Sequence, residues 1–213
     1  MRPVHSLYGI LSLSLAVQGT RAAPASSNAT TKSPEQSWTY SIPSTLQNAS
    51  SQARFTIPST NQTIDKETLL LLDSPAVTNI TDSAFDWWYF DVVSDTNANE
   101  SIVVTFFSAS HLAFPFLDPT DTVLIAYLWA TFANGTIFTK YMPASIATVT
   151  GGKNAERFSE GIWAETGFSW RALDEQLTRY EVTIAAEEMH VQGKFTISAV
   201  RSPPPPSFFF CFI

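Results

Sequence analysis

Two carboxylates, Asp86 and Asp91, flank the most aromatic stretch of this sequence, SAFDWWYFDVVS at residues 83–94. A carboxyl group beside aromatic rings could protonate an alkene or serve in an acid–base pair. The two lie five positions apart, however, so on a regular strand they point to opposite faces and cannot easily share a pocket. Asp91 with Tyr89 on one face is the better hydrogen-bonding pair. The alternative is a buried carboxylate held by backbone N–H groups or an arginine.

The same stretch predicts a β-strand, because its residues are β-formers bounded by turn-formers. Successive side chains of a strand point to opposite faces. One face would carry Trp88, Phe90 and Val92, and the other would carry Trp87, Tyr89, Asp91 and Val93. Both faces are aromatic, so we expect the strand to be covered on both sides, one cover being a ligand or a second domain.

The familiar motifs of nucleophilic, metal and nucleotide chemistry are missing from the sequence. It contains no G-x-S-x-G, H-E-x-x-H, P-loop or Rossmann glycine pattern. Its histidines, His5, His111 and His190, are far apart and have no cysteine partners, since Cys211 is the only cysteine. Zinc sites use three or four ligands, so we predict no metal and no cofactor. His111 is expected in a solvent-facing loop.

Strand signals dominate the sequence that must position these residues. The apolar or alternating runs are 102–107, 123–132, 136–142, 167–172, 177–186 and 190–200. Asn134-Gly135 between two of them is a strong hairpin signal. No window shows a sustained helical period. The prediction is an all-β fold, either an antiparallel β-sandwich or a lipocalin-like barrel, in which Trp129, Trp163 and Trp170 are core residues by default.

The ends of the chain have a different composition. Residues 1–22 have the charge, apolar run and small residues of a signal peptide, which predicts secretion or the secretory pathway. A Ser/Thr/Asn-rich flexible leader would follow at 23–66, with 38–40 and 54–57 as short runs able to pair at a sheet edge. The β-rich domain is expected at 67–200, and a Pro-rich crossing with an anomalous apolar tail at 201–213 suggests truncation.

Charge and sequons restrict the partners further. The net charge of −7 disfavours nucleic acid and anionic membranes. No segment after the signal peptide is long and apolar enough for a membrane span. Six of the eight asparagines begin an N-x-S/T triplet, which is typical of exported glycoproteins. The predicted glycosylation sites are Asn28, Asn48, Asn61, Asn79, Asn99 and Asn134.

The aromatic stretch, the following SIVVTFFSAS at 101–110 and the loop AFPFLDP at 113–119 resemble the start of the hydroxyneurosporene-synthase-like family. That family includes bacterial carotenoid hydratases and fungal Diels–Alderases of polyketide pathways. VRSPPPP at 200–206 resembles the Pro-rich crossing after the family's first domain. The resemblance implies a first, N-terminal domain only, with the missing second domain expected in cis and a hydrophobic small molecule (a polyene, polyketide or isoprenoid) bound between or beside the two.

The resemblance implies a Diels–Alderase-like isomerase or cyclase, or a fragment of one, that folds a polyene in secondary-metabolite biosynthesis. Such a pericyclase needs positioning and a hydrogen bond to a carbonyl rather than a nucleophile or metal. The substrate-binding candidates are Trp87, Trp88 and Phe90, and the catalytic candidates are Asp91, Tyr89 and Asp86. Three alternatives remain: a secreted non-catalytic carrier of hydrophobic ligands, a hydratase of an isoprenoid double bond with an aspartic acid as proton donor, and a structural domain with an aromatic core.

Overall fold

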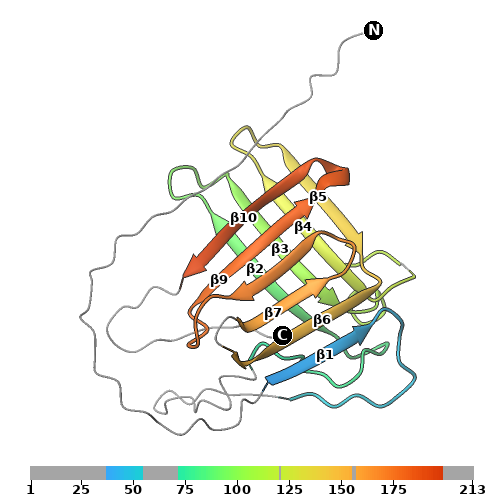
Figure 1. Ribbon diagram of the computed structural model, residues 1–213. Helices are drawn as coiled ribbons and strands as arrows, with labels where there is room; N and C mark the ends of the chain where they lie inside the picture. The colour runs from blue at the N-terminus through green and yellow to red at the C-terminus, as the bar shows by residue number, and fades with distance from the viewer. Residues whose placement is uncertain (1–36, 55–71, 120, 155–156, 199–213) are drawn as a thin grey trace, which may run out of the picture.

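The computed structural model describes residues 37–54, 72–119, 121–154 and 157–198, and these residues form two antiparallel sheets (Figure 1). The six-stranded sheet has the order β1-β6-β7-β8-β9-β10 and the four-stranded sheet the order β2-β3-β4-β5. The strands of the larger sheet are β1 (Ser37–Pro43), β6 (Ile146–Asn154), β7 (Arg157–Trp163), β8 (Phe168–Ala172), β9 (Arg179–Ala186) and β10 (Val191–Ser198). Those of the smaller sheet are β2 (Asp86–Val93), β3 (Ser101–Ser108), β4 (Leu124–Thr131) and β5 (Ile137–Pro143). A 3₁₀ turn, η1 (Glu187–Met189), lies between β9 and β10.

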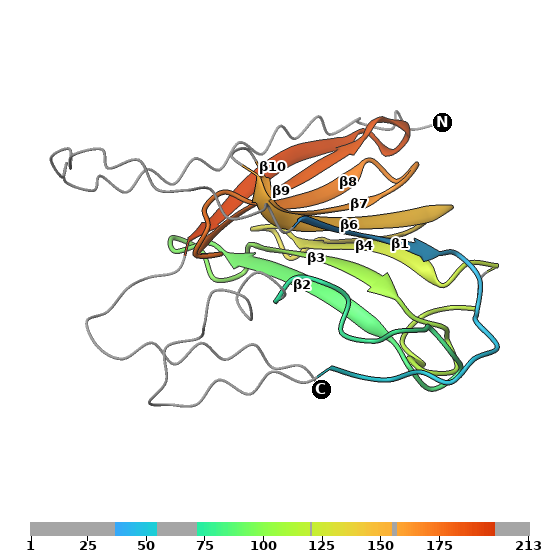
Figure 2. The ribbon, with the colours of Figure 1, turned by 60° about the horizontal axis from the view of Figure 1, so that its bottom comes forward.

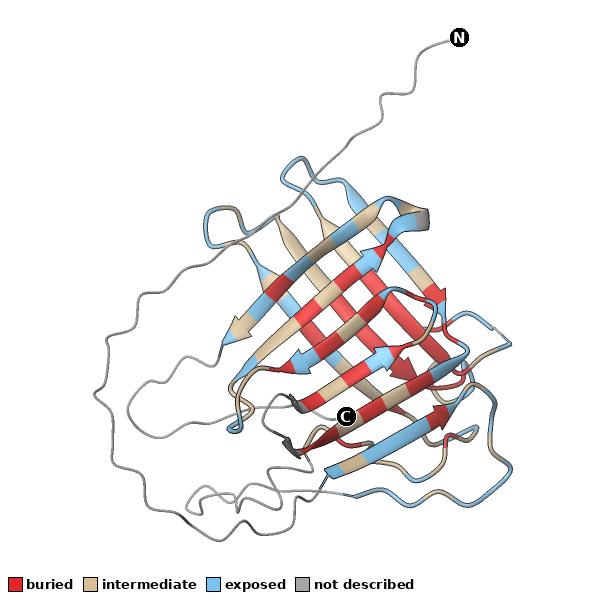
Figure 3. Ribbon diagram, in the orientation of Figure 1, coloured by how far each residue is buried: buried red, intermediate tan, exposed pale blue. Residues whose placement is uncertain are grey.

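The two sheets pack face to face as separate layers, which Figure 2 shows edge-on. Their facing side chains form the main core, and buried positions alternate with exposed or half-buried ones along β8 and β9 of the larger sheet (Figure 3). Within the described residues neither sheet closes on itself, because β1, β10, β2 and β5 each pair with one neighbour only. The predicted all-β sandwich is therefore confirmed, and the lipocalin-like barrel is not formed.

The smaller sheet follows the sequence pattern closely. The predicted hairpin joins β4 to β5, and Gly135 has a φ of 78°, a conformation that glycine adopts without steric cost. Asn134 supports the turn, because its side-chain oxygen accepts the N–H of Thr136 at 3.0 Å. Strand β3 crosses the centre of the molecule and is buried from Val104 to Ser108. Because five consecutive residues of β3 are buried, both faces of this sheet are covered at its centre.

The larger sheet contains two strands, β6 and β7, that the sequence pattern did not reveal. Glycine and polar residues interrupt their apolar runs, and β6 shifts register between Gly151 and Asn154. Two of these glycines have a packing role. The indole of Trp38 lies over Gly151 and the indole of Trp170 over Gly161, where an added Cβ would come within 2.2 Å of each ring. The glycines that break the apolar pattern of β6 and β7 therefore make room for tryptophan side chains of the neighbouring strands β1 and β8.

The segments that precede β2 in the chain pair with neighbouring parts of the fold. β1 lies inside the range expected to be a flexible leader, yet it pairs with β6 along its full length, which confirms that 38–40 pairs at a sheet edge. A connection that we call the strap, residues 74–85, then runs beside residues 47–54, with a single bridge between Ala53 and Val77. Residues 1–22, the tail 201–213 and most of 54–57 lie outside the described residues, so the predicted domain limits stay predictions.

Candidate functional site

The aromatic strand β2 has the two aromatic faces that its sequence predicts. Its inner face places Asp86, Trp88, Phe90 and Val92 toward the larger sheet, and its outer face carries Trp87, Tyr89 and Asp91. Each face belongs to a different aromatic cluster. The inner side chains join the main core, whereas Trp87 joins a second cluster on the outer surface of the smaller sheet.

The inner face of β2 is covered by tryptophans of the larger sheet. The ring of Trp88 lies 5.3 Å from that of Trp163 and 6.3 Å from that of Trp170, and Phe90 is 5.9 Å from Trp170. Trp163 and Trp170 are both 1% exposed, which confirms their expected place in the core. The contacts described for Trp88 and Phe90 are thus packing contacts, and a substrate-binding role for these two stays a prediction.

A half-buried aspartate that sequence reasoning missed, Asp73, lies against this aromatic core. Asp73 accepts hydrogen bonds from the hydroxyl of Ser159 on β7 and from the hydroxyl of Tyr180 on β9, the latter at 2.9 Å. Its backbone oxygen accepts the indole N–H of Trp88 at 3.0 Å. Burial raises the pKa of Asp73 to about 6 and also raises that of Tyr180. Asp73 follows an apolar run, and nothing local in the sequence distinguishes it from a surface turn residue.

Asp86 is buried, and backbone groups hold its carboxylate. Its Oδ2 accepts the N–H of Ala76 at 2.5 Å and its Oδ1 accepts that of Trp87 at 2.9 Å. Burial raises its pKa to about 6, against the opposing effects of these hydrogen bonds and of Arg54. Asp91, by contrast, is exposed on the other face. The two aspartates therefore point in opposite directions, as predicted, and do not meet as an acid–base pair.

The outer face of the smaller sheet carries the second aromatic cluster, which we call the outer aromatic cluster. It consists of Phe107, Ala109, Leu117, Ile125 and Tyr127, with Phe85, Trp87, Phe114, Trp129 and Tyr141 packed against them. The loop between β3 and β4 covers one end of it: Phe114 packs edge-on against Trp87 at 4.9 Å, and Phe116 against Tyr127 at 5.5 Å. Trp129 thus belongs to this outer cluster rather than to the main core.

The strand register places four hydroxyl groups in one row across this outer face. Tyr89 of β2 pairs with Thr105 of β3, Thr105 pairs with Tyr127 of β4, and Tyr127 pairs with Tyr141 of β5. Directly paired residues lie on the same face of a sheet, so the row runs from edge to edge. Tyr89 and Phe116, which lie beside the cluster, are 52% and 50% exposed, and Trp87, Trp129 and Tyr141 within it are only partly buried. The outer aromatic cluster is therefore only partly covered.

The phenols in this row keep their protons. The rings of Tyr127 and Tyr141 lie 4.6 Å apart and their hydroxyls share a hydrogen bond. Burial raises the pKa of Tyr127 to about 12, and proximity to Tyr141 adds to the effect. Burial also raises the pKa of Tyr89, and the neighbouring Asp91 contributes. At neutral pH the row is thus a set of uncharged hydrogen-bond donors set among aromatic rings.

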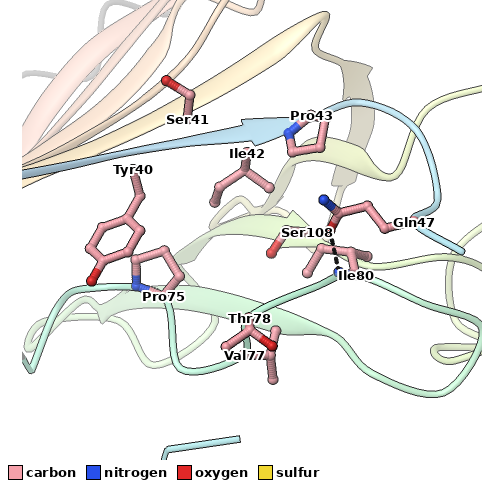
Figure 4. Close-up of a pocket in the computed structure, with 10 residues that line it drawn as sticks. All are labelled: Tyr40, Ser41, Ile42, Pro43, Gln47, Pro75, Val77, Thr78, Ile80 and Ser108. Carbon is pink, nitrogen blue, oxygen red and sulfur yellow. Dashed lines mark hydrogen bonds between the residues drawn. The ribbon is translucent and has the colours of Figure 1, made fainter. Parts of the chain in front are cut away.

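A shallow pocket lies between β1 and the strap (Figure 4). It is small, with a water-accessible volume of about 80 Å³, and it is partly open to solvent. The lining residues are Tyr40, Ser41, Ile42, Pro43, Gln47, Pro75, Val77, Thr78, Ile80 and Ser108. Gln47 joins its two sides, because its side-chain oxygen accepts the N–H of Ile80 at 2.9 Å. Sequence reasoning placed no site here.

Several other expectations can be compared with the described residues. His111 is exposed in its loop, as expected. Across the described ranges, no three His, Cys, Asp or Glu side chains come together as a metal site would require. Within the same ranges no helix is long and apolar enough to cross a membrane. Of the sequons, Asn28 and Asn61 lie outside the described residues, whereas Asn48, Asn99 and Asn134 are exposed and Asn79 is half-buried.

Two curated fungal proteins are similar to this chain in sequence, and no family model matches it. One is the quinolone epoxide rearrangement protein asqO of Emericella nidulans, 33% identical over 138 residues, a match that spans 62% of this chain and 35% of that protein. The other is the quinolone epoxide rearrangement protein penF of Penicillium thymicola, 32% identical over 136 residues, spanning 62% of this chain and 36% of that protein.

The fold is also that of a solved structure. CghA, crystallised with Sch210972 and without it, superposes with a TM-score of 0.50 at 18% and 17% identity, over 70% of this chain and 36% of CghA. The fungal side of the predicted resemblance is thereby supported, and the link to hydroxyneurosporene synthases stays a prediction. The chain spans about a third of the length of the proteins that it matches.

Proposed function

We propose that this chain is one β-domain of a protein that binds a hydrophobic secondary-metabolite intermediate and promotes its rearrangement or cyclisation. The observation that carries the proposal is the outer aromatic cluster, which presents rings and protonated phenols on a partly uncovered sheet face. The similarity to two quinolone epoxide rearrangement proteins supports the class of substrate. The finer proposal is a pericyclase-like isomerase, in keeping with the resemblance to fungal Diels–Alderases.

The geometry suits a reaction that depends on positioning. Aromatic rings hold a flat conjugated molecule by stacking, and uncharged hydroxyls can hydrogen-bond to its oxygen atoms without breaking a bond themselves. Tyr89 and Tyr141, at the two ends of the hydroxyl row, are the members that solvent reaches, whereas Thr105 and Tyr127 between them are buried. Tyr89 therefore takes the main substrate-contacting role in this proposal, with Asp91 beside it and Trp87 in the wall.

The partial cover of this face also supports a second domain in cis. Tyr89, Phe116 and Leu112 are each at least half exposed, and aromatic surface of this kind is usually buried against a ligand or another domain. The relatives are about three times as long as the matched segment. We propose that the remainder of such a protein closes over the outer aromatic cluster and completes the pocket.

A hydratase receives less support from the same geometry. Protonating an alkene needs an acid that reaches the substrate. Asp86 is enclosed by backbone N–H groups, and Asp91 is exposed to solvent on the other face of β2. A carrier of hydrophobic ligands would use the same aromatic face without chemistry, so the experiment must separate binding from turnover.

The test compares two exposed tyrosines on different sheets. Tyr89→Ala removes the proposed contact, and Tyr40→Ala is the matched control, because Tyr40 is 41% exposed and lies in the shallow pocket instead. The 213-residue chain and both variants are incubated with a quinolone epoxide and with a linear polyene. Binding is followed by tryptophan fluorescence and product by chromatography with mass spectrometry. The same set is repeated with the chain fused to the part of the Emericella nidulans protein that the match leaves uncovered.

The proposal expects the fused protein to bind and convert a substrate, with a loss of tenfold or more in Tyr89→Ala and none in Tyr40→Ala. Binding without conversion in every format would identify a carrier and overturn the enzymatic proposal. Equal losses in the two variants, or no binding at all, would show that the outer aromatic cluster is not the site.

A further inference from the structure

The outer face of the smaller sheet has a charge of one sign. The strand register assigns every second residue of β2, β3, β4 and β5 to this face. Asp91 is the only charged residue among these strand positions. The described part of the β3–β4 connection adds Asp118, Asp121 and His111 and contains no lysine or arginine. The fixed charge that the described sheet presents on its outer face is therefore negative.

No cation from the neighbouring strands or turns offsets this charge. Lys140 of β5 pairs with Leu128, which is buried in the main core, so Lys140 belongs to the opposite set of positions. The turns at 94–100 and 132–136 contribute only acidic charges, Asp95 and Glu100. Within the described ranges no hydrogen bond or ion pair involves the side chain of Asp91. Its carboxylate can therefore accept a hydrogen bond from a group that approaches from solvent.

Asp91 and Tyr89 form a complementary pair of hydrogen-bonding groups. They are two residues apart on β2, which places them on the same face of the strand, about 6.8 Å apart along it. A phenol that keeps its proton can donate a hydrogen bond, whereas a carboxylate only accepts. Both side chains are exposed. The pair thus offers a donor and an acceptor side by side at one edge of the sheet.

A platform of small and apolar side chains lies beside this pair. Asp91 pairs with Val103 and Val103 with Trp129, while Tyr89 pairs with Thr105. Trp87 stands on the same face as Tyr89, at the end where the β3–β4 connection covers the outer aromatic cluster. A flat molecule that lies on Val103 and Thr105 would therefore present one edge to the phenol and the carboxylate together.

We propose that Tyr89 and Asp91 recognise one edge of a planar lactam, with the phenol donating to the lactam carbonyl and the carboxylate accepting from the lactam N–H. The inference rests on the proposed function, since it concerns the same outer aromatic cluster, and it narrows the ligand to molecules with a carbonyl beside an N–H group. A hydrogen bond to a carboxylate is stronger than one between neutral groups. A ligand carboxylate, in contrast, would be repelled by Asp91 and by the acidic groups around it.

Two tricyclic probes of the same shape separate the N–H contact from stacking. Phenanthridinone is a planar lactam, and in benzochromenone a ring oxygen replaces its N–H group. Dissociation constants are measured by quenching of tryptophan fluorescence for the 213-residue chain and for the fused protein described above. The wild-type protein should bind the lactam at least about fivefold more tightly, because a site that hydrogen-bonds an N–H group disfavours an analogue without it. A carboxylated lactone should bind more weakly than the lactone, and salt should reduce that difference.

Three variants assign the selectivity to individual groups. Asp91→Ala removes the acceptor and should make the two dissociation constants equal within about twofold, whereas Asp91→Asn keeps an uncharged acceptor and should leave an intermediate ratio. Tyr89→Ala should weaken both probes, because each carries the carbonyl. The matched control is Glu175→Gln, which removes one negative charge from an exposed residue of the β8–β9 connection and should keep the wild-type ratio.

The outcomes distinguish this inference from the proposed function. Equal binding of the two probes by the wild-type protein, or a preference for the lactam that survives Asp91→Ala, would overturn the lactam contact. If Tyr89→Ala still weakened both probes in that case, the outer aromatic cluster would remain the binding site. A preference lost equally in Glu175→Gln would assign it to net charge and also overturn the inference. Binding of neither probe in either format would overturn the inference together with the proposed site.

Discussion

Gly161→Ala should destabilise the sandwich, because Trp170 already occupies the space above this glycine. A Cβ built on Gly161 would lie 2.2 Å from Nε1, 2.4 Å from Cε2 and 2.7 Å from Cζ2 of that indole. Real Cβ contacts are longer than 3.0 Å, so either the ring or the strand must shift. The ring has little freedom, since it is 1% exposed and packs against Trp88, Phe90 and Tyr180.

The size of the effect follows from overpacking of a closed core, which costs about 1–3 kcal/mol for each added methyl group. A small gain in β-propensity from replacing glycine offsets less than about 1 kcal/mol of it. Urea unfolding followed by circular dichroism gives the free energy of unfolding for wild type and variant. Because a shift of Trp170 also displaces Trp88, we expect a change in tryptophan emission in the folded variant.

Gly151→Ala provides the matched comparison. Its Cβ would come equally close to an indole, 2.2 Å from Cζ2 of Trp38, but Trp38 is half-buried on the edge strand β1 and can swing outward. We therefore expect Gly161→Ala to be the more destabilising of the two. If both variants unfold at the same urea concentration, or if Gly161→Ala matches wild type, the argument that core enclosure sets the cost is refuted.

Three further predictions concern the carboxylates, the phenols and the sequons. Asp86→Ala should lower the free energy of unfolding by about 1–3 kcal/mol because it strands buried backbone N–H groups, whereas Asp91→Ala should stay within about 0.5 kcal/mol in the same urea experiment. The phenol of Tyr127, with its pKa raised to about 12, should resist ionisation in an ultraviolet titration, and its contribution to stability should be lost as the pH rises from 10 to 12. The variant Tyr141→Phe should lower the pKa of Tyr127. An unchanged pKa in that variant would contradict the shared hydrogen bond. If the chain is exported, mass spectrometry of glycopeptides should find Asn79 the least modified of the four described sequons. The reason is that its side-chain nitrogen already donates to Ser50 O at 2.7 Å. Full glycan occupancy at Asn79 would contradict the prediction.

Much of the fold could be predicted because it depends on local alternation. The hairpin at Asn134-Gly135 and the inward set Tyr180, Val182 and Ile184 on β9 were visible as patterns, since a two-residue period assigns side chains to faces without knowledge of partners. Strands β6 and β7 were not visible. Their glycines make room for tryptophans of other strands, and that requirement exists only after the strands have paired.

The features of the candidate site also separate into those that the sequence predicts and those that only the tertiary structure decides. The sequence of β2 alone determined that it has two aromatic faces and that Asp86 and Asp91 point apart, because the geometry of a strand fixes both. Only the tertiary structure decided which face is closed. The inner rings meet the larger sheet, and the outer ones remain partly open under the β3–β4 loop. Asp73 and the hydroxyl row were likewise decided in three dimensions, since burial and cross-strand register join residues that are up to 107 positions apart in the sequence.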